Sequence, residues 1–543
     1  MTKLTEASVD FARAHIEAFY DSDSFPKRDE YRALWGEWSM VKSHLTQKEV
    51  KDLVFEGPRC LPARKARGGY RMVHQLEPLS AVVYTALAHM VAEGVEAKRQ
   101  PANVVFSYRM KLSSTKYFEE KNYGAFLGRC RELGGKHAYV FKTDISDFYN
   151  RIYIHRIHGN IAIADPKLAD TATTLEKFLM KLNAKTSSGI PVGPAASIVM
   201  AEAVLLDVDQ FLTDKGYDWA RYVDDICVFH DDPRALAILQ EELIQYLYDN
   251  HRLSLSQSKT SLRQSGKLLD SLADPDAHGG KTLLELARAV LDYGDSYTKE
   301  DIDELVAKYL QANPASPLGD EPAPDENTSE FAAAVRRWDQ REQKERQELR
   351  DDVLLQMLNE STKGKDLDLG VARYALRKGR ILKTPALIGP VLAKISKLRP
   401  ALPEACLYLK EVTTPERFTE HQDSVRAVFE SETFKASKFA KLWLFWYLSS
   451  QKALIEDPVL GRKLWSEADV DWQMQAARTA GIAARVRQRK ASASALGLWD
   501  RRSLLMASPL LPRAEREPWL SSLAPRDFVE TVIIEWGKKQ MQP

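Results

Sequence analysis

The hydrophobic pattern divides the chain into a mixed first half and a helical second half. The first fifty residues carry apolar positions at helical spacing, with polar turns between them. From Phe55 to about Leu262, short apolar runs such as "AYVFKTD" and "RYVDDICVF" alternate with helical stretches such as "DDPRALAILQEELIQYLYDN". The β-branched and aromatic residues of the short runs indicate strands, and the leucine spacing of the longer stretch indicates a helix. We therefore expect one α+β domain over residues 1–265.

The strand signals nearly vanish in the second half of the chain. Residues 313–330, "NPASPLGDEPAPDENTSE", combine four prolines with a surplus of acids, which is typical of a flexible connector, although an ordered surface loop is the alternative. Mixed-sign charges over 331–360 predict a long charged helix, and helices broken by Pro or Gly then continue to Trp536 at roughly the spacing of a helical solenoid. The pattern predicts a connector over 266–330 and an all-α domain over 331–543.

Composition and charge are those of an ordinary soluble globular protein, with 44% hydrophobic and 28% charged residues. The formal net charge is +1, so any binding of nucleic acid must come from local basic patches. The four cysteines are isolated from one another, which argues against a zinc site or a disulfide framework. The N-terminus lacks the apolar core of a signal peptide, and no apolar run approaches the roughly 20 residues that span a bilayer. We expect a cytoplasmic protein without a membrane partner.

Acidic residues lie at the ends of two predicted strands. Asp144 ends the first run, and Asp224 and Asp225 interrupt the second where a tight turn would lie. Aspartate is common in turns, but two strand ends can also bring three carboxylates to one edge of a sheet, where divalent cations relieve their repulsion. Hard oxygen ligands suit Mg²⁺, with Mn²⁺ as an alternative. Two such ions can activate a 3′-hydroxyl and stabilise leaving pyrophosphate, which predicts nucleotidyl transfer.

Taken in chain order, these motifs resemble the palm of a reverse transcriptase. Asp144 falls in the first catalytic motif, the Gly/Pro-rich turn "SGIPVGP" falls in the second, and "YVDD", which begins at Tyr222, matches the YxDD of the third. Viral RNA-dependent RNA polymerases usually have GDD instead. The resemblance implies an RNA-directed DNA polymerase, a nucleotidyltransferase, whose catalytic residues are Asp144, Asp224 and Asp225. It also implies that Ile145 joins the three aspartates as a metal ligand.

The same resemblance implies a site for dNTPs. Tyr149 falls where these enzymes place an aromatic gate, and a bulky ring under the sugar would exclude a 2′-hydroxyl; a core aromatic is the alternative. The resemblance places Phe148 in the same nucleotide site. The basic segment "PRCLPARKARGGYRMVHQLEPL" resembles the fingers that clamp the triphosphate, with Arg71 first and Lys65 second, since bidentate arginine contacts suit phosphate oxygens. A solvated loop is the alternative there. "LSLSQSKTSL" resembles a later motif in which Lys259 meets the triphosphate or protonates pyrophosphate, and an exposed structural lysine is the alternative.

The second motif departs from the family pattern. Most reverse transcriptases have PQG, whereas this chain has Pro191, Val192 and Gly193. We keep these three residues in the predicted nucleotide site, but the contact that the Gln amide makes is absent.

The combined motifs, followed by a helical half, look most like the abortive-infection and related "unknown group" bacterial reverse transcriptases of anti-phage defence. In that group a HEAT-like helical repeat region follows the palm, and "VARYALRKGRIL" over 371–382 is similar to a short motif of that region. The resemblance implies an α+β fold with right-hand palm and fingers over 1–265 and a HEAT-like repeat domain over 331–543. It also implies a homo-oligomer.

The resemblance leaves two modes of DNA synthesis open. In one, DNA is made without a template and is attached to the enzyme's own tyrosine; in the other, an associated non-coding RNA is copied. The missing Gln and the weak overall basic charge favour the first mode. The tyrosines of the second half that we consider as primers are Tyr297, Tyr309, Tyr374, Tyr408 and Tyr447.

Two further classes of protein compete with this interpretation. A retron or group II intron reverse transcriptase would be expected to be shorter or to show PQG and a zinc-linked endonuclease, and the chain has no Cys/His cluster. A helical scaffold with a degenerate palm would not be expected to retain all three carboxylates. Substitution of Asp224 separates a polymerase, which would lose its function, from a scaffold, which would keep it.

Overall fold

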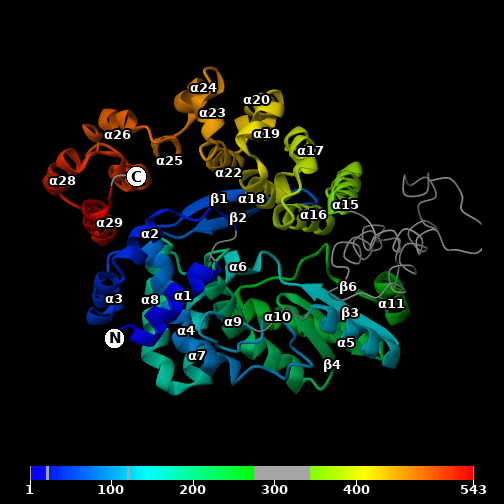
Figure 1. Cartoon of the computed structure of the whole chain (residues 1–543). Helices are drawn as coiled ribbons and strands as arrows, with labels where there is room; N and C mark the ends of the chain where they lie inside the picture. Colours follow the sequence, from blue (N-terminus) through cyan, green and yellow to red (C-terminus); the bar gives the residue numbers. More distant parts are fainter. Residues whose placement is uncertain (1, 20–23, 119–122, 274–342, 542–543) are drawn as a thin grey trace, which may run out of the picture. The chain divides into compact units, whose positions relative to one another are not determined.

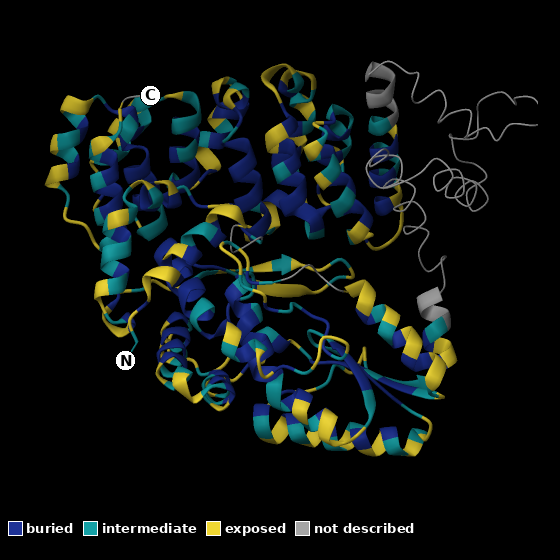
Figure 2. Cartoon of the chain, turned by 60° about the horizontal axis from the view of Figure 1, so that its bottom comes forward, coloured by how far each residue is buried: buried dark blue, intermediate teal, exposed yellow. Residues whose placement is uncertain are grey.

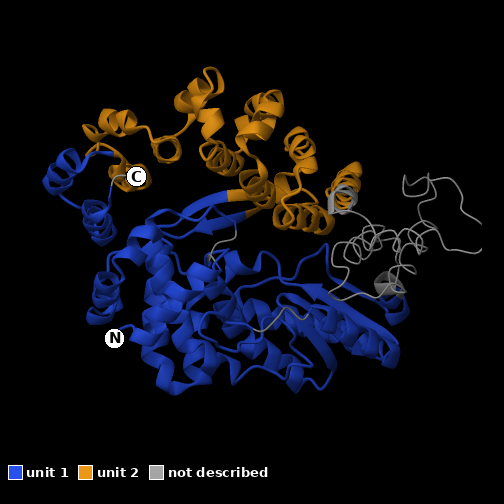
Figure 3. Ribbon diagram, in the orientation of Figure 1, with its two compact units in different colours: residues 1–61, 72–273, 511–543 blue, residues 62–71, 274–510 orange. Residues whose placement is uncertain are grey.

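The structure, a computed structural model, describes residues 2–19, 24–118, 123–273 and 343–541 (Figure 1). The chain divides into two compact units, coloured separately in Figure 3. The first comprises Met1–Leu61, Met72–Ala273 and Leu511–Pro543, and the second Pro62–Arg71 and Asp274–Leu510. The predicted acidic connector at 313–330 lies outside the described residues. The domain boundaries drawn from the sequence therefore stay a prediction.

The first unit is a mixed α and β structure in which helices pack around a small sheet. Its described helices are α1 (Glu6–Ala18), α2 (Glu30–Gly36), α3 (Trp38–Gln47), α4 (Pro78–Glu96), α5 (Tyr123–Lys136), α6 (Phe148–Arg151), α7 (Ile154–Ala164), α8 (Ala169–Leu182), α9 (Ala195–Asp214), α10 (Pro233–His251), α11 (Ser265–Ala273), α28 (Arg513–Ser522) and α29 (Phe528–Lys539). The described strands of the chain are β1 (Arg59–Arg64), β2 (Tyr70–Gln75), β3 (Tyr139–Asp144), β4 (Asp218–Tyr222), β5 (Asp225–His230) and β6 (Ser261–Gln264).

Four of these strands form an antiparallel sheet in the order β4-β5-β3-β6. Strand β3 pairs with β5 along its whole length, from Tyr139 opposite His230 to Asp144 opposite Asp225. The turn between β4 and β5 therefore lies at the same end of the sheet as the end of β3. Strands β1 and β2 form a separate two-stranded sheet.

The sheet is covered on both faces. Side chains alternate along a strand, and Cys227 and Phe229 of β5 belong to a buried cluster with residues of α5 and α11, so Ile226 and Val228 point to the opposite face. Helix α10 packs against β3 and β5. This two-sided burial explains why β5 is a continuous apolar run in the sequence. The buried members of the cluster are Phe106, Phe126, Cys130, Leu133, Val140, Ala220, Cys227, Phe229 and Leu268.

The last two helices of the chain pack on the first ones. Helix α29 lies against α2, where a Cβ on Gly36 would come within 2.8 Å of the Trp536 ring, and the Lys539 ammonium donates to Glu37 at 2.7 Å. The C-terminal helices α28 and α29 thus belong to the first unit.

The second unit is helical. Its helices pack in succession, α15 on α16, α16 on α18, α18 on α22, α22 on α25 and α25 on α27, and the buried residues lie between them (Figure 2). The predicted helical C-terminal region is confirmed, whereas its description as HEAT-like repeats stays a prediction. The described helices are α15 (Gln343–Lys363), α16 (Leu369–Ile381), α17 (Ile388–Ala393), α18 (Leu402–Val412), α19 (Pro415–Glu420), α20 (Gln422–Glu430), α21 (Glu432–Ala436), α22 (Lys438–Leu448), α23 (Lys452–Glu456), α24 (Leu460–Glu467), α25 (Val470–Ala480), α26 (Ala483–Lys490) and α27 (Leu498–Met506).

One described helix, α4, is long and apolar enough to cross a membrane by length and composition. Of its most apolar 18-residue window, 78% is buried inside the protein, as in the core helix of a soluble protein. The cytoplasmic location stays a prediction.

Helix α10 offers a matched test of this packing. Leu243 is fully buried, whereas its neighbour Ile244 is 43% exposed. We expect Leu243→Ala to lower the free energy of unfolding by roughly 2–5 kcal/mol, because it leaves a cavity beneath the sheet. Ile244→Ala should change it by less than about 0.5 kcal/mol. Urea denaturation followed by circular dichroism measures both, and equal effects of the two substitutions would contradict the packing.

Candidate active site

Three carboxylates meet at one end of the sheet. Asp144 is the last residue of β3 and is 5% exposed. Asp224 lies in the turn between β4 and β5, and Asp225 begins β5 directly opposite Asp144. Each offers a carboxylate oxygen, and these oxygens all lie within 4.8 Å of one another. Among the described residues, these three aspartates form the one group of at least three Asp, Glu, His or Cys side chains that lie close enough together to hold a metal ion.

Backbone contacts tie the turn to the neighbouring strand. The Ile145 amide donates to the Asp224 carbonyl at 3.3 Å, and the Ser256 amide donates to the Asp144 carbonyl at 2.7 Å. Val223, the first residue of the turn, has φ 57°, a left-handed conformation that is rare for a β-branched residue. The tight reversal that presents Asp224 is therefore held in a strained conformation. Ile145 is thus bonded to the turn that carries Asp224. Its role as a metal ligand stays a prediction.

Two of the three carboxylates bind a proton more tightly than usual, as shown by the raised pKa values of Asp224 and Asp225. Burial and then the charge of Asp144 raise the pKa of Asp224 to about 6, and the same two causes raise the pKa of Asp225. The Lys259 ammonium donates to Asp144 Oδ1 at 2.7 Å. Burial alone would lower the pKa of Lys259, but the hydrogen bond to Asp144 and the charges of the three aspartates raise it.

This donor set fits divalent cations. It consists of hard carboxylate oxygens, which Mg²⁺, Mn²⁺ and Ca²⁺ all prefer. Among the described residues, only the Lys259 ammonium is hydrogen-bonded to one of the three carboxylates. A bound cation would offset both the burial and the charge of Asp144, which raise the pKa of Asp224.

The second sequence motif is held against α6, which carries Phe148 and Tyr149. The Ile190 amide donates to the Tyr149 carbonyl at 2.9 Å. Gly189 has φ +88°, and a Cβ there would lie 3.0 Å from the Asn150 carbonyl oxygen, so glycine is required for this close approach. Phe148 is buried. Burial first, and then nearby groups that include Glu202 and Asp224, hold the pKa of Tyr149 well above its usual range, so its phenol is neutral.

Val192, which replaces the Gln expected from the sequence resemblance, has its backbone paired with His74 of β2. The His74 amide donates to the Val192 carbonyl at 2.9 Å, and the Val192 amide donates to His74 Nδ1 at 3.0 Å. Burial lowers the pKa of His74, which favours the neutral ring that can accept this bond. The sequence analysis missed His74, since a lone histidine in a strand gives no signal of its partner. Pro191 and Gly193 flank Val192, and Gly193 has φ 131°.

Tyr222 lies in an aromatic group beside the carboxylates. Its ring centroid is 5.0 Å from that of Tyr123 and 5.9 Å from that of Phe126. The charge of Asp225 follows burial among the causes that raise the pKa of Tyr123, so this ring also borders the site. The sequence analysis did not single out Tyr123.

The predicted triphosphate ligands Lys65 and Arg71 lie in the segment Pro62–Arg71, which is grouped with the second unit. Both are exposed. The segment turns tightly, with the Lys65 amide donating to the Gly69 carbonyl at 3.1 Å. The carboxylates belong to the first unit, so the roles of Lys65 and Arg71 stay predictions.

The tyrosines considered as primers differ in exposure. Tyr408 and Tyr447 are 0% exposed, and burial is the largest cause that raises the pKa of each. Neither phenol can reach a nucleotide without local unfolding. Tyr374 is partly exposed, and Tyr297 and Tyr309 lie outside the described residues.

Comparison with known proteins assigns the domain around these carboxylates. Residues 63–275 match the family described as "Reverse transcriptase (RNA-dependent DNA polymerase)". The chain thus contains a reverse transcriptase domain, and it is an RNA-directed DNA polymerase, a nucleotidyltransferase. Domains of this family take nucleotide substrates and a nucleic-acid template and use divalent metals.

Among solved structures, the chain is similar to "Structure of telomerase from Candida albicans in complexe with TWJ fragment of telomeric RNA". The identity is 9% and the TM-score 0.29, over 94% of this chain and 71% of that chain. A similarity this low supports no detail of the present site. No curated protein matches the sequence.

The raised pKa of Asp224 predicts a pH-dependent effect of Asp224→Asn. The pKa rises from its ordinary 3.8 to about 6 in the folded protein, so the folded state binds the proton more tightly, and this stabilisation is lost as the pH rises through about 6. Asparagine carries no charge at any pH. In EDTA, the melting temperature of Asp224→Asn relative to wild type should therefore rise between about pH 4 and about pH 6.5 and stay level above that.

Divalent metal should favour wild type over Asp224→Asn. Adding Mg²⁺ or Mn²⁺ at neutral pH should raise the melting temperature of wild type more than that of Asp224→Asn, because metal binds the folded state. Differential scanning fluorimetry measures both series. A difference between the two proteins that is independent of pH and of metal would contradict the described coupling of the carboxylates.

Proposed function

We propose that this chain is an anti-phage defence reverse transcriptase that adds dNTPs by two-metal nucleotidyl transfer. The observation that carries the chemistry is the cluster of Asp144, Asp224 and Asp225, with oxygens within 4.8 Å of one another inside a reverse transcriptase domain. The defence role is supported by the resemblance of the motifs, and of the helical second half, to abortive-infection reverse transcriptases. In this proposal the protein acts in the cytoplasm as a homo-oligomer.

In the proposed reaction a hydroxyl oxygen attacks the α-phosphorus of a dNTP. A new P–O bond forms, the bond to the β-phosphate breaks, pyrophosphate leaves, and the hydroxyl proton is released. Asp144, Asp224 and Asp225, with the Ile145 carbonyl, would hold two divalent cations, Mg²⁺ or alternatively Mn²⁺. Bound there, these ions would supply activation of the hydroxyl and stabilisation of the leaving pyrophosphate.

Basic residues of the chain complete the proposed site. In this proposal the Lys259 ammonium, which is 56% exposed and paired with Asp144, meets the triphosphate or protonates pyrophosphate. Arg71 and Lys65 clamp the triphosphate in this proposal, since both are exposed cations: Lys65 directly follows β1 and Arg71 lies on β2. Phe148, Pro191, Val192 and Gly193 shape the nucleotide pocket around Tyr149.

Tyr149 is the proposed sugar gate. Its backbone is fixed by Ile190, and its pKa is affected by the charge of Asp224, which indicates that the phenol lies near the carboxylates. Tyr149→Ala should raise the use of rNTPs relative to dNTPs by roughly 10-fold or more, because the clash with the 2′-hydroxyl is removed. Tyr149→Phe retains the ring and should retain the selection. Primer extension with each nucleotide set measures the ratio, and equal selectivity of the two variants would refute the gate.

Two modes of synthesis are possible, and they differ in the hydroxyl that receives the first nucleotide and in the use of a template. In the mode we favour, a tyrosine phenol oxygen of the chain forms the P–O bond, so DNA grows covalently on the protein without a template. The apolar Val192 side chain, which carries no amide where Gln is expected, supports weakened template contact. In the second candidate mode, an associated non-coding RNA is copied, which the family's description as RNA-dependent favours.

Purified protein tests both the activity and the mode. We expect wild type, but not Asp224→Ala, to migrate more slowly on a denaturing gel and to recover its mobility after DNase. Asp249→Ala, which removes an exposed carboxylate of α10, is the matched control and should behave as wild type. Random sequence in the released DNA supports the untemplated mode, and a repeated sequence supports the templated one.

Extension of a primed substrate tests the polymerase itself. Asp224→Ala should lower kcat roughly a thousandfold or more, because several kcal/mol of charge stabilisation are lost with the metal site. An unchanged rate for Asp224→Ala would overturn the proposed chemistry, and no extension by wild type would favour a scaffold.

A further inference from the structure

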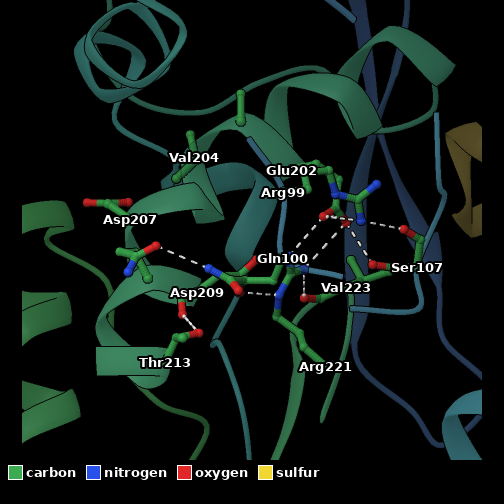
Figure 4. A network of polar contacts seen from close by, with 12 residues as sticks. Arg99, Gln100, Ser107, Glu202, Val204, Asp207, Asp209, Thr213, Arg221 and Val223 are labelled. Atoms are coloured by element: carbon green, nitrogen blue, oxygen red, sulfur yellow. Dashed lines mark hydrogen bonds and ion pairs between the residues drawn. The ribbon is translucent and has the colours of Figure 1, made fainter. Parts of the chain in front are cut away.

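A buried polar network lies directly behind the turn that carries Asp224 (Figure 4). Its centre is Arg221 of β4, whose side chain is 0% exposed. The guanidinium holds both oxygens of Asp209 on α9, with Nε to Oδ1 at 2.7 Å and Nη2 to Oδ2 at 2.6 Å. Nη2 also donates to Oε2 of Glu202 at 2.9 Å. Glu202 precedes Asp209 on the same helix, α9. The arginine is therefore oriented by two carboxylates of one helix.

The remaining nitrogen of this guanidinium points to the turn. Arg221 Nη1 donates to the carbonyl oxygen of Val223 at 2.8 Å. Val223 is the residue with φ 57°, a conformation that a β-branched residue adopts only when its surroundings impose it. A charge-assisted hydrogen bond from a rigid guanidinium supplies such a constraint.

The backbone of Arg221 is also fixed, by hydrogen bonds to the segment that contains Val104 and Phe106. Its amide donates to the Val104 carbonyl at 2.9 Å, and its carbonyl accepts from the Phe106 amide at 3.0 Å. The side chain thus extends from a fixed backbone to a fixed pair of acids. Movement of the Val223 carbonyl would break the bond rather than carry the arginine with it.

A second arginine completes the network. Arg99 Nη2 lies 2.8 Å from Glu202 Oε2 and donates to the Ser107 carbonyl at 2.6 Å, while the Ser107 hydroxyl donates to Glu202 Oε1 at 2.8 Å. Arg99 and Arg221 therefore balance Glu202 and Asp209. Well-packed apolar residues can stabilise a core as well as such a group does, so burial of four charges at this place is better explained by the geometry that they impose on the turn.

We propose that Arg221 is a positioning residue of the active site. Through its hydrogen bond to the Val223 carbonyl it fixes the turn, and the turn sets the distances of Asp224 and Asp225 from Asp144 that divalent cations require. This inference rests on the proposed function of the three carboxylates as metal ligands. Arg221 touches neither substrate nor metal in this role.

Arg221→Lys tests the proposal, because lysine keeps the charge but cannot hold Asp209 at two points and reach Val223 at once. Mn²⁺ binding to the full-length protein, measured by electron paramagnetic resonance, provides a readout that does not depend on polymerase activity. We expect Arg221→Lys to weaken Mn²⁺ binding roughly 10-fold. Arg156→Lys is the matched control, because Arg156 pairs with Asp207, also on α9, at 2.8 Å and away from the turn. The Arg156→Lys protein should bind Mn²⁺ with the affinity of wild type.

Val223→Gly distinguishes positioning of the turn from general support of the core. Glycine adopts positive φ without steric cost, so the turn should depend less on Arg221 when Val223 is replaced. The double variant Arg221→Lys with Val223→Gly should recover most of the lost Mn²⁺ affinity. A purely structural role of the buried ions predicts no recovery, and that result would overturn the proposal.

The remaining outcomes are also distinguishable. Wild-type affinity in a folded Arg221→Lys protein would overturn the inference and leave the proposed function intact. If wild type binds Mn²⁺ no better than Asp224→Ala does, the proposed metal site fails and the inference fails with it. If Arg221→Lys does not fold, Glu202→Gln gives the same test: it should weaken Mn²⁺ binding in the same direction, and unchanged affinity would overturn the proposal.

Discussion

Repulsion among three carboxylates at one end of a small sheet is the constraint on which the rest of the first unit depends. Asp144 and Asp225 face each other across paired strands, and Asp224 is added by the turn. Burial and the nearby charge of Asp144 raise the pKa of Asp224, and among the described residues only the Lys259 ammonium is paired with these carboxylates. The fold therefore keeps a site that is unfavourable without a cation and favourable with one.

The sheet and its helices supply the rigidity that this arrangement needs. Burial of β5 on both faces fixes its register, and the register places Asp225 opposite Asp144. On the other side of the turn, Arg221 connects the Val223 carbonyl to α9. The strain at Val223 is thus confined between a fixed strand and a fixed guanidinium, which is where a strained turn can persist.

The assignment to a reverse transcriptase domain joins this geometry to a reaction. Residues 63–275 match the family, and the three catalytic motifs predicted from the sequence fall inside that range. The helical second unit is confirmed as helical, but its repeat character, and the defence role and priming mode proposed with it, depend on resemblance. Because the phenols of Tyr408 and Tyr447 are buried, Tyr374 is the candidate primer that remains among the described tyrosines that we considered.

The sequence by itself determined the strands that end at Asp144 and at Tyr222, the leucine face of α10, and the three acidic residues of the site. Each of these signals lies within a few neighbouring residues, where periodicity and charge spacing are visible. Only the tertiary structure decided the pairing of Val192 with His74, the partners of Arg221 on α9, and the packing of α29 against α2. These contacts join residues from 12 to more than 500 positions apart, and because no local pattern specifies which distant side chain will fill a given space, they emerge only when the chain is packed.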